Sequence, residues 1–108
     1  MKHMCQLDDI LSELDNNDDC FRDFINTEYI QAGILRLHVD DLDTQEPHPV
    51  DEVYFVIRGN GMINLNGKDY HIKRGTSIYV PAGTEHRFQS NSRDLVVFYA
   101  LASGNKED

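Results

Sequence analysis

Apolar residues in the first part of the chain recur with the period of a helix. Within residues 7–14 they are Leu7, Ile10, Leu11 and Leu14. This i, i+3, i+4, i+7 spacing predicts a short amphipathic helix. A second helical turn is predicted after it, capped by Asp18 or Asp19, with the apolar residues Phe21, Phe24 and Ile25 on one side. We therefore expect residues 1–28 to form an N-terminal helical extension.

From Tyr29 onward the apolar residues alternate with polar ones, which is the period of a strand. In residues 29–39 this alternation predicts one face with Leu35, Leu37 and Val39 and another with Arg36 and His38. Similar short runs follow at 53–57, 62–65, 70–73, 77–80, 86–89 and 95–101.

Turn signals rich in glycine, proline and asparagine separate these runs. The strongest hairpin signal is Asn66-Gly67, because a type I′ turn needs positive φ at both central residues. Short strands at this spacing with no helix between them predict an all-β, antiparallel sandwich or barrel over residues 29–103. Residues 104–108 are predicted to be a C-terminal tail.

The composition and charge of the chain restrict the classes of partner that we expect it to bind. The chain has 108 residues, enough for one domain, and a formal net charge of −9. That charge disfavours nucleic acid and anionic lipid, whereas cations and small polar ligands fit it better. The sequence contains neither a signal peptide nor an apolar run of about 18 residues, so we expect a cytoplasmic protein without a membrane partner.

The most polar stretch precedes the run at 53–57. His48 stands between Pro47 and Pro49, which hold the loop extended and fairly stiff. Glu52 opens the predicted strand, and the period of two places Tyr54 on the same face as Glu52. In a barrel, that face puts a carboxylate at the mouth of an apolar lumen.

A second histidine, His86, follows a turn with proline and glycine, and here the sequence resembles a known family. Gly75, Pro81, Gly83 and His86 are similar in every position to the second motif of the cupin superfamily, which consists of small jelly-roll β-barrels. Glu52 and Gly59 have the spacing of its first motif. The resemblance covers about residues 34–101 and implies a jelly-roll β-barrel there, and the predicted N-terminal helical extension lies outside it.

The resemblance also implies a divalent metal. Cupins bind it through two histidines and a glutamate of the first motif and the histidine of the second, which correspond here to His48, Glu52 and His86. The place of the first histidine falls on Glu46, so Glu46, with Gln45 as an alternative, is the candidate fourth ligand. Two imidazoles and one carboxylate form a facial triad, and a second carboxylate would favour Mn, Fe, Ni or Zn.

Two function classes follow from this resemblance. One is an enzyme that acts on a small, acid-like organic substrate through the metal, such as a dioxygenase, or a metal-dependent isomerase, decarboxylase or lyase. The other is a non-catalytic module that binds or senses a small ligand or a metal. The sequence leaves open whether the protein is an enzyme.

Two side chains and one strand face have further predicted roles. Tyr54 is a candidate hydrogen-bond donor beside the metal, or an ordinary packed tyrosine. Arg36 is the candidate for holding a substrate carboxylate, with a salt bridge at the rim as the alternative. Cupins commonly pair through sheet faces, and the apolar second face of residues 53–57 (Val53, Phe55 and Ile57) predicts a homodimer.

Overall fold

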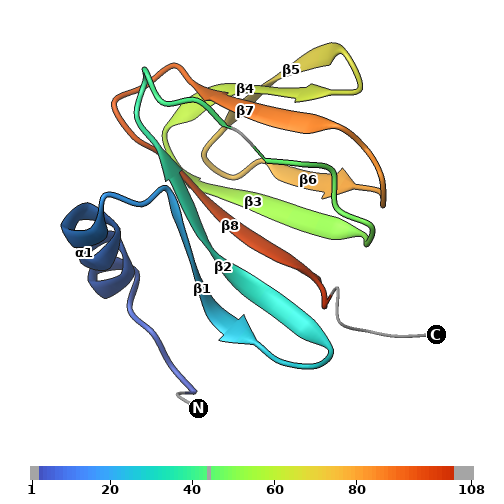
Figure 1. The fold of residues 1–108 in the computed structure, drawn as a ribbon. Coiled ribbons are helices and arrows are strands. Elements are labelled where there is room, and N and C mark those ends of the chain that lie inside the picture. Colours follow the sequence, from blue (N-terminus) through green and yellow to red (C-terminus); the bar gives the residue numbers. More distant parts are fainter. Residues whose placement is uncertain (1–2, 44, 104–108) are drawn as a thin grey trace.

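The computed structural model describes residues 3–43 and 45–103, and within them one helix precedes eight strands (Figure 1). The elements, in chain order, are α1 (Leu7–Asn17), β1 (Phe21–Asn26), β2 (Ile30–Leu37), β3 (Glu52–Arg58), β4 (Asn60–Leu65), β5 (Lys68–Lys73), β6 (Ser77–Val80), β7 (His86–Ser90) and β8 (Leu95–Ala102).

The strands form two antiparallel sheets. The larger sheet has the order β1-β2-β8-β3-β6, and the smaller one has the order β5-β4-β7. In the larger sheet most neighbours are distant in sequence, and β8 lies between β2 and β3. The prediction of an all-β, antiparallel fold is therefore confirmed, as an open sandwich of two sheets rather than a closed barrel.

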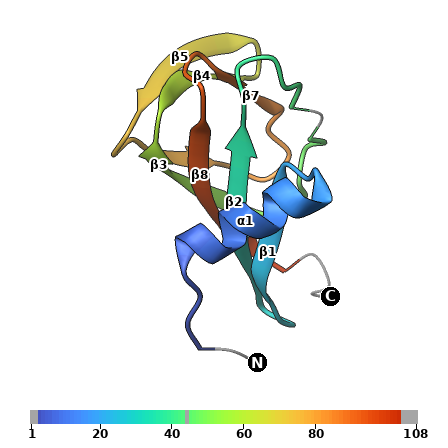
Figure 2. The ribbon, with the colours of Figure 1, turned by 90° about the vertical axis from the view of Figure 1, so that its left-hand side faces the viewer.

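Apolar side chains fill both faces of the larger sheet. Between the two sheets lies one core cluster, with Tyr54 and Val56 from β3 packed against Ile63 and Phe88 from the smaller sheet. On the opposite, outer face, α1 lies across β1 and β2 (Figure 2). Leu14 of the helix is 1% exposed there and belongs to a second cluster with Ile34 and Val96. The helix is thus packed on the sheet.

The predicted helix over residues 7–14 is confirmed, but the predicted second helical turn is wrong. Asp18 ends α1 with a left-handed φ of 56°, and Phe21 begins the edge strand β1. A bulge between Asp23 and Ile25 interrupts its pairing with β2. An extra residue in a strand breaks the period of two, which is why Phe24 and Ile25 follow each other and imitate a helical spacing.

The structure also tests the predicted hairpin and the predicted extent of the strand at residues 29–39. The Asn66-Gly67 hairpin is confirmed, with φ values of 50° and 92° and with β4 paired to β5. Strand β2 ends at Leu37, so Val39 lies beyond it and is 53% exposed. The predicted tail at 104–108 lies outside the described residues. Among the described helices, none has the length and apolarity needed to cross a membrane.

Candidate metal centre

Backbone contacts bring the two motifs together. The loop that joins β2 to β3 carries His48, and the turn before β7 carries Gly83 with a φ of 79°. The amide of Gly83 donates to the carbonyl of His48 at 2.7 Å, and the amide of Ala82 donates to Oδ1 of Asp51 at 2.9 Å. These two bonds hold the stiff loop of the first motif against the turn of the second.

Three side chains converge at this junction. Glu52 opens β3 and His86 opens β7 in the facing sheet, and both are 3% exposed. The Nε2 atoms of His48 and His86 each lie 3.6 Å from Oε1 of Glu52. One donor atom from each side chain lies within 4.8 Å of the other two. The predicted triad is therefore brought together in a geometry that can hold a metal ion.

One oxygen of the Glu52 carboxylate lacks a hydrogen-bond donor among the described residues. This oxygen, Oε1, is buried. Burial raises the pKa of Glu52 above its ordinary value, against smaller opposing effects of Tyr54 and His86. A buried carboxylate oxygen without a donor is unfavourable unless it is neutralised or paired. A cation between the imidazoles would provide that pairing.

The tautomer of His86 suits coordination. Its Nδ1 lies 3.0 Å from the carbonyl oxygen of Thr84, which can only accept, so Nδ1 carries the proton and Nε2 presents a lone pair. The hydroxyl of Tyr54 lies 3.0 Å from that Nε2 and 3.2 Å from Oε1 of Gln45. The hydroxyl has one proton, so it donates to one of these two atoms at a time. When it donates to Gln45, Nε2 of His86 remains free to bind a metal ion. Hydrogen bonding of the far nitrogen is typical of metal-binding histidines.

Asp43 anchors the loop, a role that sequence reasoning missed. Its carboxylate accepts from the amide of Phe88 at 2.7 Å and from the amide and side chain of Gln45, each at 3.1 Å. It is 8% exposed, although it lies in an acidic loop. The signal available in the sequence was its spacing of two from Gln45, which is typical of an Asx turn.

A cavity of about 430 Å³ opens beside the triad. His48 and Glu52 line one end, and Tyr99 and Leu101 of β8 line another part of the wall. Sequence reasoning did not identify these two β8 residues, although Tyr99 alternates with Val97 and Leu101, which are buried in the core between the sheets. Small-molecule sites commonly have volumes of about 300 to 1,000 Å³, so this cavity can hold a small organic ligand.

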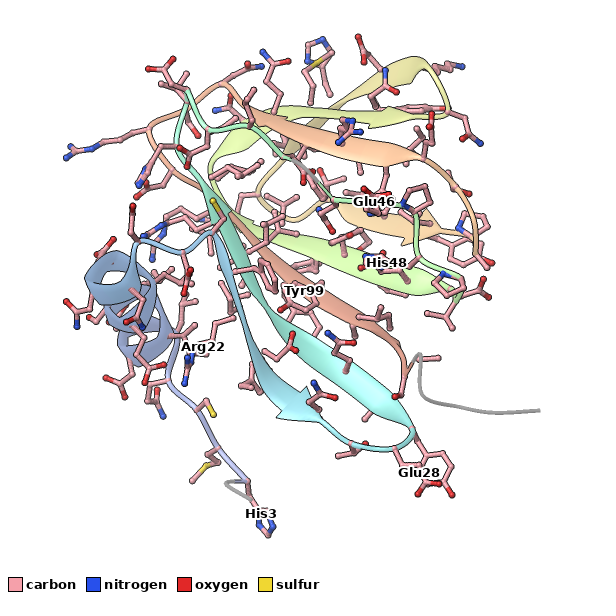
Figure 3. The ribbon with its side chains drawn as sticks, in the orientation of Figure 1. His3, Arg22, Glu28, Glu46, His48 and Tyr99 are labelled. Carbon is pink, nitrogen blue, oxygen red and sulfur yellow. The ribbon has the colours of Figure 1, made fainter. Side chains whose placement is uncertain are left out.

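The remaining predicted site residues lie in different places. Tyr54 and Phe88 are buried beside His86, with the Tyr54 and Phe88 rings edge to face at 4.8 Å. Glu46 lines the cavity, in the same loop as His48 (Figure 3), but does not belong to the cluster of three donor atoms. Arg36 is not brought to the cavity. It projects from the outer face of β2, where its guanidinium pairs with Asp15.

The fold and the site together define a small two-sheet β-sandwich with a histidine and glutamate cluster at one end. A family model described as the cupin domain matches residues 33–101. The chain belongs to the cupin family.

Individual proteins support this assignment. An uncharacterized protein of Streptomyces coelicolor is 36% identical over 97 residues, which span 90% of this chain and 92% of that protein. A cupin with a double-stranded β-helix fold from Methanocaldococcus jannaschii superposes with a TM-score of 0.72. That match has 22% identity and covers 79% of this chain and 80% of the other, so it shows the fold.

A third similarity involves part of a larger protein. The transcriptional activator RhaR of Salmonella choleraesuis, which is of the HTH type, is 32% identical over 76 residues. They span 70% of this chain but 27% of RhaR, so the likeness is confined to about a quarter of that protein.

Proposed function

We propose that the protein binds one divalent first-row metal ion through His48, Glu52 and His86 and uses it as an enzyme on a small organic molecule. The observation that carries this proposal is the buried Oε1 of Glu52, which has no donor among the described residues and lies 3.6 Å from two imidazole nitrogens. Two imidazoles and a carboxylate suit Fe, Mn, Ni or Zn.

The bound ion would supply Lewis acidity or redox chemistry beside the cavity, as in a dioxygenase or in a metal-dependent isomerase, decarboxylase or lyase. The chain's own residues position the reactants. Tyr54 lies within hydrogen-bond distance of Nε2 of His86 and of Gln45, which makes it a candidate for orienting a bound molecule. The apolar side chains of Leu35, Leu37 and Leu101 on the cavity wall would shield part of a bound ligand from water.

Elemental analysis tests this proposal. We expect protein purified without chelators, or reconstituted with metal after chelation, to hold about one ion per chain. The His48→Ala/His86→Ala double variant should lose it, whereas His71→Ala, which removes an exposed histidine of β5, should keep it. If the double variant held as many metal ions per chain as the unaltered protein, the proposal would be wrong.

A second candidate function is a sensing module without turnover. The similarity to part of RhaR favours it, because RhaR is described as a transcriptional activator. Turnover assays with each metal form separate the two functions. Tight ligand binding without product in any metal form would support the module.

Homodimerisation through the outer face of β3 is a further proposal. Val53 and Phe55 are 49% and 44% exposed there, while Ile57 packs against the cluster under α1. Burying the first two would remove apolar surface from water. Sedimentation at micromolar concentration should show a dimer, and a monomer alone would refute it.

A further inference from the structure

Much of the cavity lining is apolar, including two side chains that are exposed. Leu35, Leu37 and Leu101 line its interior. Phe21 and Leu42 also line it, yet they are 58% and 82% exposed. Apolar side chains at that exposure gain from being covered by an apolar ligand, at roughly 25 cal/mol per Å² of surface removed from water. The lining therefore fits a ligand with an apolar body.

The charged groups on the described lining all have the same sign. Asp43, Glu46 and Glu52 contribute carboxylates, and no lysine or arginine is among the described lining residues. A divalent ion at the triad would cancel two of these charges and leave one negative charge. An anionic ligand would enter this cavity against its field, whereas a cation would be attracted.

Neither Arg87 nor Arg36 lines the cavity. The guanidinium of Arg87 donates to the carbonyl of Asp43 at 2.9 Å and to that of Gln45 at 3.4 Å. Arg36 is held by Asp15 on the outer face of the sheet. The carboxylate that Arg36 was predicted to hold thus has no cationic side chain to meet it in the cavity.

An aromatic pair strengthens the preference for a cation. The rings of Phe21 and Tyr99 meet edge to face with centroids 6.5 Å apart, and both side chains line the cavity. The faces of aromatic rings attract ammonium groups by about 0.5 to 2 kcal/mol, depending on their exposure to water. A ring face turned toward the cavity would add this attraction to that of the carboxylates.

We propose that the cavity binds a small amine-bearing compound with an apolar body and discriminates against carboxylic acids. The proposal deepens the proposed function, because it names the substrate class of the same site. It also replaces the acid-like substrate predicted from the sequence. The ammonium group would lie toward Glu46, and the apolar body would lie along Leu35, Leu37 and Leu101.

Three probes that share a phenyl ring and a three-carbon chain test the ligand class: 3-phenylpropylammonium, 3-phenylpropan-1-ol and 3-phenylpropanoate. Their affinities are measured by calorimetry at pH 7 and low salt on the full chain after treatment with chelator. We expect the amine to bind about 10-fold more tightly than the carboxylate, with the alcohol between them. Carboxylate binding as tight as that of the amine, or no binding of any probe at millimolar concentration, would overturn the proposal.

Measuring metal-free protein separates this proposal from the proposed function. If the chain binds no metal, the order of the three probes still tests the cavity. If the chain binds metal but prefers the carboxylate without it, only the proposed ligand class fails.

Two matched variants then locate the effect. Glu46→Gln removes a lining charge, and Glu28→Gln removes an exposed charge at the distant β1–β2 turn (Figure 3). We expect Glu46→Gln to weaken amine binding about 3-fold to 10-fold and to leave alcohol binding unchanged. Glu28→Gln should alter neither. Equal weakening by both variants would mean that the preference reflects the protein's net charge, and would overturn the assignment to the cavity.

Discussion

The larger sheet buries a charged side chain on each face, and the two differ in their partners. On the outer face Arg36 is 8% exposed and its guanidinium pairs with Asp15 of α1. On the inner face Glu52 is 3% exposed, and its buried Oε1 accepts no hydrogen bond from the described residues. Arg36 and Glu52 are thus buried to a similar degree, but only Arg36 has an opposite charge of the chain within hydrogen-bond distance among the described residues.

The difference distinguishes structure from function. A buried charge costs several kcal/mol unless it is paired or neutralised. The pair of Arg36 and Asp15 joins α1 to the sheet and needs nothing from outside the chain. Among the described residues, two imidazole nitrogens lie 3.6 Å from Oε1 of Glu52, which is too long for a hydrogen bond but suits a cation shared with the carboxylate. Stabilisation of Glu52 should therefore depend on a metal, and that of Arg36 should not.

The largest expected effect comes from adding zinc to chelator-treated protein. At a zinc concentration 100 times Kd, the free energy of unfolding should rise by about 2.7 kcal/mol, because the ion binds only the folded state. Urea denaturation with and without zinc measures this increment.

Variants that affect the two buried charges should differ in how much zinc raises their free energy of unfolding. Asp15→Ala should gain as much as the unaltered protein, since the two charges lie on opposite faces of the sheet. Glu52→Gln should gain little. A full increment in Glu52→Gln would contradict the role of Glu52 as a ligand.

The next effect is on the outer face. Asp15→Ala should lower the free energy of unfolding by about 1 to 2 kcal/mol, because it leaves the buried guanidinium of Arg36 without its carboxylate. The side chain of Asp15 is 64% exposed, and access of water keeps the loss below that of a fully buried pair. Denaturant unfolding measures it, with Asp40→Ala in an exposed loop as the control. Equal stability of the two variants would mean that the pair contributes nothing.

The sequence alone predicted much of the inner site. The spacing of Glu52, Gly59, Gly83 and His86 carries the two motifs, and motif spacing reflects strand and turn lengths that the fold must respect. Gly59 illustrates this constraint, since it has a φ of 89° and a Cβ there would lie 2.0 Å from the carbonyl oxygen of Asp94. Such requirements are local and can be read from a sequence.

The position of Arg36 could not be read in this way. Alternation in β2 placed it opposite Leu35 and Leu37, but both faces of the sheet are apolar, so the sequence did not reveal which face bounds the cavity. That choice depends on α1, which covers the outer face from a distant part of the chain. The bulge in β1 was missed for a similar reason, because it is defined by pairing with β2.

The smallest effect concerns Glu52 without metal. Its pKa is raised by burial, so the folded state holds the proton more strongly than the unfolded chain does. The protonated form contributes stability below about pH 4, and this contribution is lost as the pH rises through the folded-state pKa.

The amide of Glu52→Gln carries no charge at any pH. In chelator-treated protein, this variant should therefore gain stability relative to the unaltered chain as the pH rises above about 4, by on the order of 1 kcal/mol. Urea titrations across that range measure the difference, and the exposed Glu28→Gln should show none. A difference that does not change with pH would mean that Glu52 is paired within the chain, as Arg36 is, and the contrast between the two faces would fail.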